Sequence, residues 1–237
     1  GIPYIKPSLF SLHYTSDNAS VIPALINTVV MTLLSLLIAV PFGIFSAIFL
    51  VEYAGKGNKF IEVIRLTTET LSGIPSIVYG LFGMLFFVNT LKWGFSVLAG
   101  AFTLSIMILP LIMRQTEEAL KAVPDSYREG SFGLGAGKLR TVFRIVLPSA
   151  VPGILAGVIL AIGRIVGETA ALIYTAGTVA QVPKNVLGSG RTLAIHMYML
   201  SSEGLYMNQA YATAVILLIL VAVSYTHLRA HETSAHL

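Results

Sequence analysis

Residues 129–148, EGSFGLGAGKLRTVFRIVLP, form a polar and basic block between long apolar runs. Acidic Glu129, followed by the small residues Gly130 and Ser131, suits the start of a helix, where a carboxylate meets the positive end of the helix dipole. Gly135 permits a turn that a residue with a Cβ would resist. The block therefore begins as a helix that ends in a glycine turn.

A second helix is expected after this turn. Arg140 and Arg144 are four residues apart and would share one of its faces. Pro148 is expected to end or kink this helix, because proline has no backbone N–H to donate. A segment this polar belongs outside the lipid, and its Lys and Arg residues place it on the cytoplasmic side.

This spacing resembles the EAA loop of ABC importer permeases, E-A-A-x-x-x-G-x9-I-x-L-P. The matching positions are Glu129, Gly135, Ile145, Leu147 and Pro148, while Gly130 and Ser131 replace the two alanines. The resemblance implies a short helix that docks into a groove on a separate ATPase subunit. The alternative is an ordinary basic cytoplasmic loop.

The composition indicates a membrane protein. Of 237 residues, 55% are hydrophobic and 11% are charged, and the mean hydropathy is +0.82. Soluble domains contain about 25% charged residues. The net charge of +4 fits Lys and Arg in cytoplasmic loops better than a nucleic-acid partner. The absence of Cys excludes a disulfide framework and a thiolate metal site.

Long apolar runs predict an all-α, polytopic transmembrane bundle. A helix needs roughly 20 residues to cross a bilayer, and the last of these runs is shorter than that. Lys and Arg place the connections 52–65 and 114–148 in the cytoplasm. The expected spans are 21–51, 66–89, 95–113, 149–178 and 209–223.

Residues 1–223 are expected to form one permease domain. Permeases of the resembled family commonly have six spans, so the first span is expected to be missing and the last to be truncated. Residues 224–237, SYTHLRAHETSAHL, contain three of the five His and show no apolar periodicity. We expect them to be a non-native tail, which gives its histidines no role in metal binding.

Two charged residues lie within an otherwise apolar run. Arg164 and Glu168 are four residues apart, so on a continuous helix they would share a face and touch each other. A charge at the bilayer centre costs about 3 kcal/mol, so both must face protein or water. In one hypothesis Arg164 attracts an anion and Glu168 holds its guanidinium in place, with Thr169 as a neutral hydrogen-bonding neighbour. The alternative is a structural ion pair.

The start of the run 66–89 is polar and broken by Gly73 and Pro75. Two interpretations remain open. It is either the cytoplasmic end of a helix, or a helix that lines an aqueous path and offers the hydroxyls of Ser72 and Ser76 to a solute.

No catalytic or metal site is expected in this chain. The glycine-rich stretch 133–138 is followed by Leu139 instead of Ser or Thr, and Phe132 occupies the position of the first P-loop glycine. The chain itself is therefore not expected to hydrolyse ATP, and the resemblance implies that ATP and Mg bind to a partner ATPase. An intramembrane enzyme that uses Glu168 as an acid or base is a rival hypothesis, but it lacks a second catalytic group.

Two further stretches of sequence make the family resemblance more specific. Residues 72–80, SGIPSIVYG, and 163–171, GRIVGETAA, resemble PstA-type permeases of phosphate importers, and the likeness covers about residues 1–223. It implies a MetI-like fold and a multi-pass protein of the bacterial inner membrane. The implied partners are a PstC-type second permease subunit, a PstB-type ATPase dimer and a PstS-type phosphate-binding protein. The residues alone leave sulfate and molybdate open as substrates.

Overall fold

The computed structural model describes residues 1–15, 18–54, 59–202, 204 and 206–234, and no strand occurs among them. The predicted all-α fold is confirmed. Three π-helical segments, Phe49–Tyr53, Met84–Thr90 and Val142–Val146, extend or join helices. The α-helices are α1 (Ile22–Ile48), α2 (Lys59–Ser72), α3 (Ser76–Gly83), α4 (Val97–Ala122), α5 (Asp125–Gly133), α6 (Lys138–Thr141), α7 (Leu147–Val166), α8 (Ala170–Ile173), α9 (Leu193–Ser202) and α10 (Met207–Ser234).

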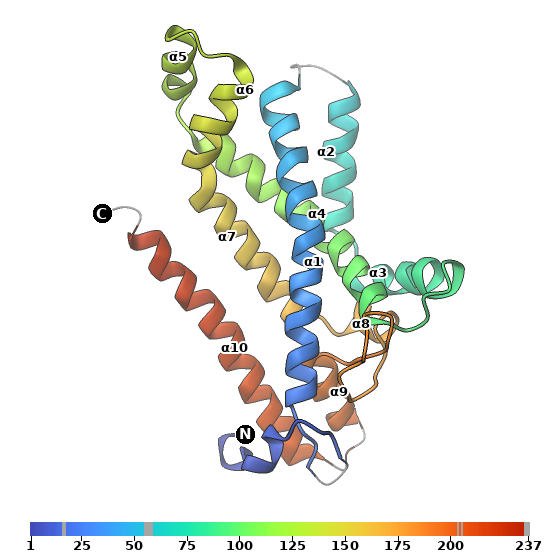
Figure 1. Ribbon diagram of the computed structural model, residues 1–237. Coiled ribbons are helices and arrows are strands. Elements are labelled where there is room, and N and C mark those ends of the chain that lie inside the picture. Colours follow the sequence, from blue (N-terminus) through green and yellow to red (C-terminus); the bar gives the residue numbers. More distant parts are fainter. Residues whose placement is uncertain (16–17, 55–58, 203, 205, 235–237) are drawn as a thin grey trace.

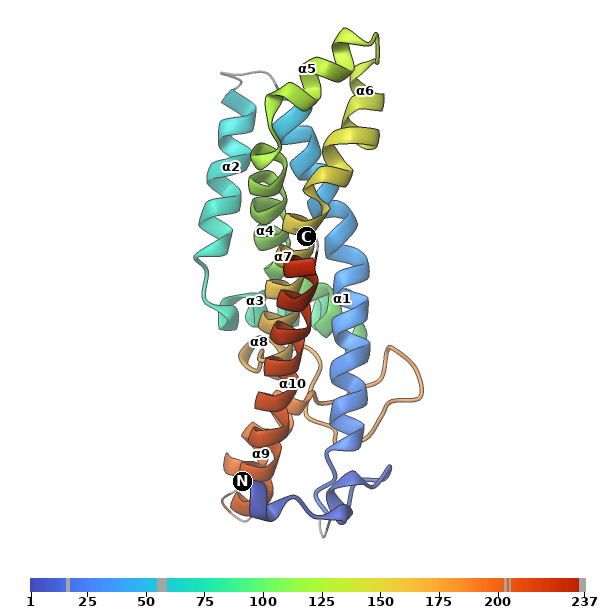
Figure 2. The same ribbon diagram turned by 90° about the vertical axis from the view of Figure 1, so that its left-hand side faces the viewer.

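The long helices α1, α4 and α7 pack together along the length of the molecule (Figures 1 and 2). Helices α5 and α6 lie at one end, beside the C-terminal end of α1 and the N-terminal end of α2. The N-terminal residues and α9 lie at the opposite end. The basic loops identify the end that carries α5 and α6 as the cytoplasmic end.

Small residues let α7 approach α4 closely. A Cβ on Gly153 would lie 2.8 Å from the Cβ of Ala119, and a Cβ on Gly157 would lie 2.5 Å from the Cβ of Gln115. Both distances are shorter than atoms tolerate, so a larger residue at either position would push the two helices apart. The glycine pair therefore serves tight helix packing, as its spacing of four predicts.

Three helical stretches are long and apolar enough to cross a membrane: Ile22–Tyr53, Val97–Ala122 and Lys138–Val166. They correspond to three expected spans, but with different ends. The second continues past residue 113 to Ala122, and the third stops at Val166, well before residue 178. Gly167 caps the C-terminus of α7, and the chain then turns into the short α8.

The expected span 66–89 is broken near Gly73 and Pro75, as its sequence indicates, and forms two helices. Helices α2 and α3, with its π-helical extension, meet at an angle of 101° and form a broken span or a re-entrant loop. Pro75 precedes α3 and cannot donate a hydrogen bond to continue α2, which explains the position of the break. As a result α3 lies across the bundle (Figure 1).

The last helix has a shorter apolar part, Met207–Val223. The backbone of α10 passes residue 223 without a break and continues to Ser234. The assignment of 224–237 as a non-native tail stays a prediction, and its last three residues lie outside the described part of the chain.

A buried polar cluster lies at the extracytoplasmic end. The guanidinium of Arg191 is 4.6 Å from the centre of the Tyr14 ring, and the fully buried His196 meets the same ring edge-on. Both ring nitrogens of His196 are buried, and the backbone of Ala19 is their polar neighbour. Burial, together with the nearby positive charge of Arg191, lowers the pKa of His196 to about 3.

This low pKa predicts acid sensitivity. His196 stays neutral in the folded protein but takes up a proton below its usual pKa of about 6.5 once the chain unfolds. The unfolded state then binds more protons, so stability falls as the pH drops from about 6.5 towards 3. The loss approaches about 1.4 kcal/mol per pH unit. We expect thermal unfolding of the detergent-solubilised protein to show a shallower pH dependence in His196→Gln. Parallel pH profiles for the two proteins would contradict this prediction.

Candidate functional site

The coupling segment, defined here as residues 125–148, forms the predicted helix, glycine turn and helix. Helix α5 ends at Gly133, Gly135 adopts a left-handed backbone with φ of +83°, and α6 begins at Lys138. One detail differs from expectation. Helix α5 begins at Asp125, so Glu129 and Gly130 lie inside it and not at its start.

A buried hydrogen bond joins the two arms of this segment. The hydroxyls of Ser131 and Thr141 are 2.8 Å apart. Thr141 also approaches the Gly137 carbonyl, with its oxygen 3.2 Å from the carbonyl oxygen. Ser131 is 6% exposed, so a small side chain at this position lets α5 lie against α6.

Pro148 is predicted to end or kink the second helix, but the helix does not end there. Residues Lys138–Val166 form one helical stretch, with Pro148 near the start of α7. In a regular α-helix the proline ring would clash with the carbonyl of Arg144. The π-helical turn Val142–Val146 shifts the hydrogen-bond register just before the proline and lets the helix continue.

The remaining motif residues differ in their exposure. Ile145 and Leu147 are half-buried, and Leu147 packs against the apolar cluster that includes Ile48 and Val146. Pro148 is exposed. Leu147 therefore anchors the end of the segment to the bundle.

The tip of the coupling segment exposes apolar side chains that the motif does not specify. Leu134 is 91% exposed and Leu139 is 65% exposed, with Tyr127 and Phe132 about half exposed. Apolar residues within a polar loop are the sequence signal that would have identified this surface. Such a patch, rimmed by polar residues, is typical of a protein–protein contact.

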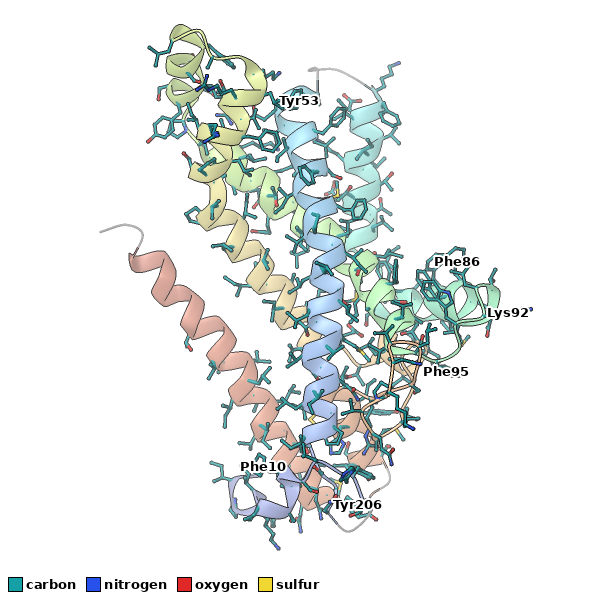
Figure 3. All side chains as sticks on the ribbon, viewed as in Figure 1. Phe10, Tyr53, Phe86, Lys92, Phe95 and Tyr206 are labelled. Carbon is teal, nitrogen blue, oxygen red and sulfur yellow. The ribbon has the colours of Figure 1, made fainter. Side chains whose placement is uncertain are left out.

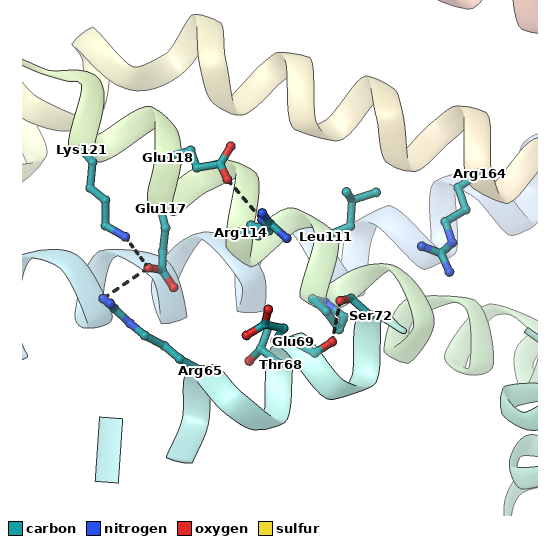
Figure 4. A pocket seen from close by; sticks show the side chains of 11 residues that line it. Arg65, Thr68, Glu69, Ser72, Leu111, Arg114, Glu117, Glu118, Lys121 and Arg164 are labelled. Atoms are coloured by element: carbon teal, nitrogen blue, oxygen red, sulfur yellow. Dashed lines mark hydrogen bonds and ion pairs between the residues drawn. The ribbon is translucent and has the colours of Figure 1, made fainter. Parts of the chain in front are cut away.

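A pocket of about 350 Å³ lies between α2, α4 and α7. Figure 4 shows polar side chains from all three helices around it. The lining residues are Arg65, Thr68, Glu69, Ser72, Pro110, Leu111, Arg114, Glu117, Glu118, Lys121 and Arg164.

Most of the pocket's cations are already paired. Glu117 accepts from Arg65 at 3.3 Å and from Lys121 at 3.0 Å. Arg114 pairs with Glu118 at 3.2 Å. Arg164 comes from α7 and points into the pocket (Figure 4). Within the described residues it is the lining cation that makes no ion pair.

The expected contact between Arg164 and Glu168 is wrong. Helix α7 ends at Val166, so the two residues do not share a helix face. The carboxylate of Glu168 is buried and accepts a hydrogen bond from the backbone N–H of Ala171 at 3.0 Å. Glu168 therefore caps α8, and no ion pair joins it to Arg164 in the part of the chain that the structure describes.

The structure brings together two of the residues proposed for the substrate path. Ser72 and Arg164 line the same pocket. Ser76, at the start of α3, is not among the residues that line this pocket. Neither are Glu168 and Thr169, which precede α8. The sequence does not identify Arg65 and Arg114 as pocket residues, because both lie in stretches expected to be cytoplasmic loops. The spacing of four between Arg114 and Glu118 signals that α4 continues past residue 113.

Comparisons with known proteins agree with this architecture. The model of the family "Binding-protein-dependent transport system inner membrane component" matches residues 39–232. The probable ABC transporter permease YqgI of Bacillus subtilis is 36% identical over 218 residues, which cover 84% of this chain and 74% of that protein. The phosphate transport system permease PstA of Mycobacterium leprae is 36% identical over 202 residues, covering 84% of this chain and 66% of that protein.

Solved structures support the fold. The methionine ABC transporter MetNI in an inward-facing conformation matches with a TM-score of 0.70 at 21% identity, covering 90% of this chain and 93% of that chain. A bacterial alginate ABC transporter matches with a TM-score of 0.69 at 17% identity, covering 95% and 82%. The chain belongs to the family of inner membrane components of binding-protein-dependent transport systems, and it is a transporter subunit, not an enzyme.

Proposed function

We propose that this chain is a permease subunit of an ATP-driven phosphate importer. The observation that carries the proposal is Arg164, whose guanidinium faces the pocket without an ion pair in the described structure. A guanidinium is planar and always charged, and it can donate two parallel hydrogen bonds to a tetrahedral oxyanion. The relation to phosphate permeases of the PstA type supports phosphate as the anion.

The other polar groups of the pocket favour phosphate over sulfate or molybdate. Near neutral pH phosphate keeps at least one P–OH group, which must donate a hydrogen bond. Glu69 lines the pocket and makes no ion pair with a described residue. Its carboxylate accepts hydrogen bonds only, so it suits a P–OH donor and repels a fully deprotonated anion. Ser72 and Thr68 add hydroxyl oxygens that also accept.

The partners follow from the family and from the coupling segment. Transport systems of this family use a separate binding protein and a separate ATPase. We propose that the former is a PstS-type phosphate-binding protein, the latter a PstB-type dimer that binds ATP and Mg, and that a PstC-type permease completes the path. The exposed apolar tip with Leu134 and Leu139 suits a helix-in-groove contact with the ATPase.

In this proposal ATP-driven movement of the ATPase displaces the coupling segment. The segment is covalently continuous with α4 and α7, which carry Arg114 and Arg164 at the pocket. Contact at the cytoplasmic end therefore biases the bundle between two conformations, and the pocket is exposed to one side or the other.

The substrate is tested by uptake of labelled phosphate in cells that lack their own phosphate permease, with the partner subunits expressed together. We expect unlabelled phosphate to compete and sulfate and molybdate not to. Arg164→Ala should lower uptake by about tenfold or more, because a charged hydrogen-bond donor is lost, while the complex still co-purifies. Competition by sulfate or molybdate would reassign the substrate, and loss of assembly in Arg164→Ala would favour a structural role.

Glu168 is expected to act through its hydrogen bond and not through its charge. Glu168→Gln keeps a carbonyl oxygen that accepts from Ala171, so its thermal stability and uptake should match the unchanged protein. Glu168→Ala removes the cap and should lower stability by about 1 kcal/mol. Uptake lost in Glu168→Gln, with normal stability, would show instead that the negative charge itself is required.

Gly135 is expected to be essential for coupling. Its φ of +83° is unfavourable for a β-branched residue, so Gly135→Val should distort the turn and displace the exposed tip. We expect ATP hydrolysis without phosphate uptake, in a complex that still inserts into the membrane. Gly133→Val is the matched control, because a Cβ there meets no atom within 4 Å and the backbone is helical. Normal uptake in Gly135→Val would contradict the coupling role.

A further inference from the structure

Arg128, in the middle of α5, makes a set of contacts that reaches beyond the coupling segment. Its guanidinium donates to Oε1 of Glu52, from Nη2 at 2.7 Å and from Nε at 3.1 Å. Nη2 also donates to the Leu120 carbonyl at 2.9 Å, and Nη1 to the Val123 carbonyl at 2.8 Å. A single side chain thus connects α5, the C-terminal end of α4 and the cytoplasmic end of the first span.

Both members of the ion pair are largely removed from water. The side chain of Arg128 is 15% exposed and that of Glu52 is 8% exposed. A buried carboxylate that loses its cation is strongly unfavourable, so this pair holds its geometry firmly. Arg128 also lies 3.2 Å from Asp125, but that carboxylate is 86% exposed, and a pair of this kind contributes little.

Chain connectivity gives the pair its importance. The coupling segment continues directly into α4 on one side and α7 on the other, so these helices must follow its movement. The first span has no such covalent connection. Glu52 lies in its terminal π-helical turn, Phe49–Tyr53, and is separated from Arg128 by 76 positions in sequence.

The other contacts between the first span and the coupling segment are less directional. Lys138 lies 5.1 Å from the centre of the Tyr53 ring, at the cytoplasmic end of the span (Figure 3). Ala47 and Ile48 belong to the same buried apolar cluster as Val142 and Val146. Apolar packing is non-directional and lets helices slide by small amounts. The ion pair with its carbonyl hydrogen bonds fixes the relative position instead.

We infer that Arg128 and Glu52 are positioning residues for coupling: their ion pair transmits displacement of the coupling segment to the first span. The inference rests on the proposed function, because it assumes that an ATPase moves this segment. Through this pair the segment moves α1 together with α4 and α7. Without it, the movement would reach α1 only through the packing of α1 on α4 and α7.

The test uses the complete transporter reconstituted in liposomes with its binding protein. The measured quantity is the number of phosphate ions imported per ATP hydrolysed. We expect Glu52→Ala to lower this ratio several-fold while ATP hydrolysis continues and the subunits still co-purify. Asp125→Ala is the matched control, because it removes the exposed partner of the same guanidinium, and it should leave the ratio unchanged. An unchanged ratio in Glu52→Ala overturns the inference.

A cross-link separates positioning from stability. The chain contains no Cys, so Glu52→Cys combined with Arg128→Cys introduces a unique thiol pair in this subunit. With cysteine-free partners, a short bifunctional thiol reagent should restore much of the lost ratio, whereas a monofunctional reagent should not. Failure of the cross-link to restore it, or a fall in ATP hydrolysis parallel to uptake, assigns the pair to stability alone and overturns the inference.

The proposed function fails in a different way from this inference. If the unchanged complex imports no phosphate, the substrate is wrong, and the same ratio is measured with the oxyanion that is imported. If the unchanged complex couples hydrolysis to import and Glu52→Ala does so equally well, only the inference about Arg128 and Glu52 is wrong.

Discussion

The close contact between α4 and α7 is the constraint on which the rest of the molecule depends. Gly153 and Gly157 bring α7 so near to α4 that an added Cβ would overlap Ala119 or Gln115. This contact brings Arg164, near the end of α7, into the pocket that Arg114 and Glu118 of α4 also line. The same two helices lead into the coupling segment. The pocket and the proposed ATPase contact therefore lie at two positions along the tightly packed helices α4 and α7.

The coupling segment could be predicted from sequence because its determinants are local. Gly135 has a left-handed backbone that few other residues adopt, and the residues around it have spacings that describe two short helices. The three long spans were also predictable, since a long apolar run with few or no charges leaves few alternatives to a membrane helix. Their ends were less predictable, because α4 continues through charged residues that pair with one another.

The errors arose where tertiary contacts decide the local structure. The spacing of Arg164 and Glu168 predicts a contact only on a continuous helix, but Gly167 ends α7 and Glu168 caps α8. Helix α8 in turn packs so closely on α3 that a Cβ on Gly80 would lie 2.8 Å from the Cα of Ala171. Nor does any local pattern indicate the pair of Arg128 and Glu52, since each residue alone looks like an ordinary loop charge.

The ion pairs of the pocket differ in how they depend on the relative positions of its helices. Glu117 on α4 accepts from Arg65 on α2 and from Lys121 on its own helix. A shift of α4 relative to α2 stretches the first of these pairs and leaves the second intact, because Lys121 moves with Glu117. Arg65 would then lose its carboxylate partner on α4. Because such a partly exposed pair contributes little energy, separating it requires little work.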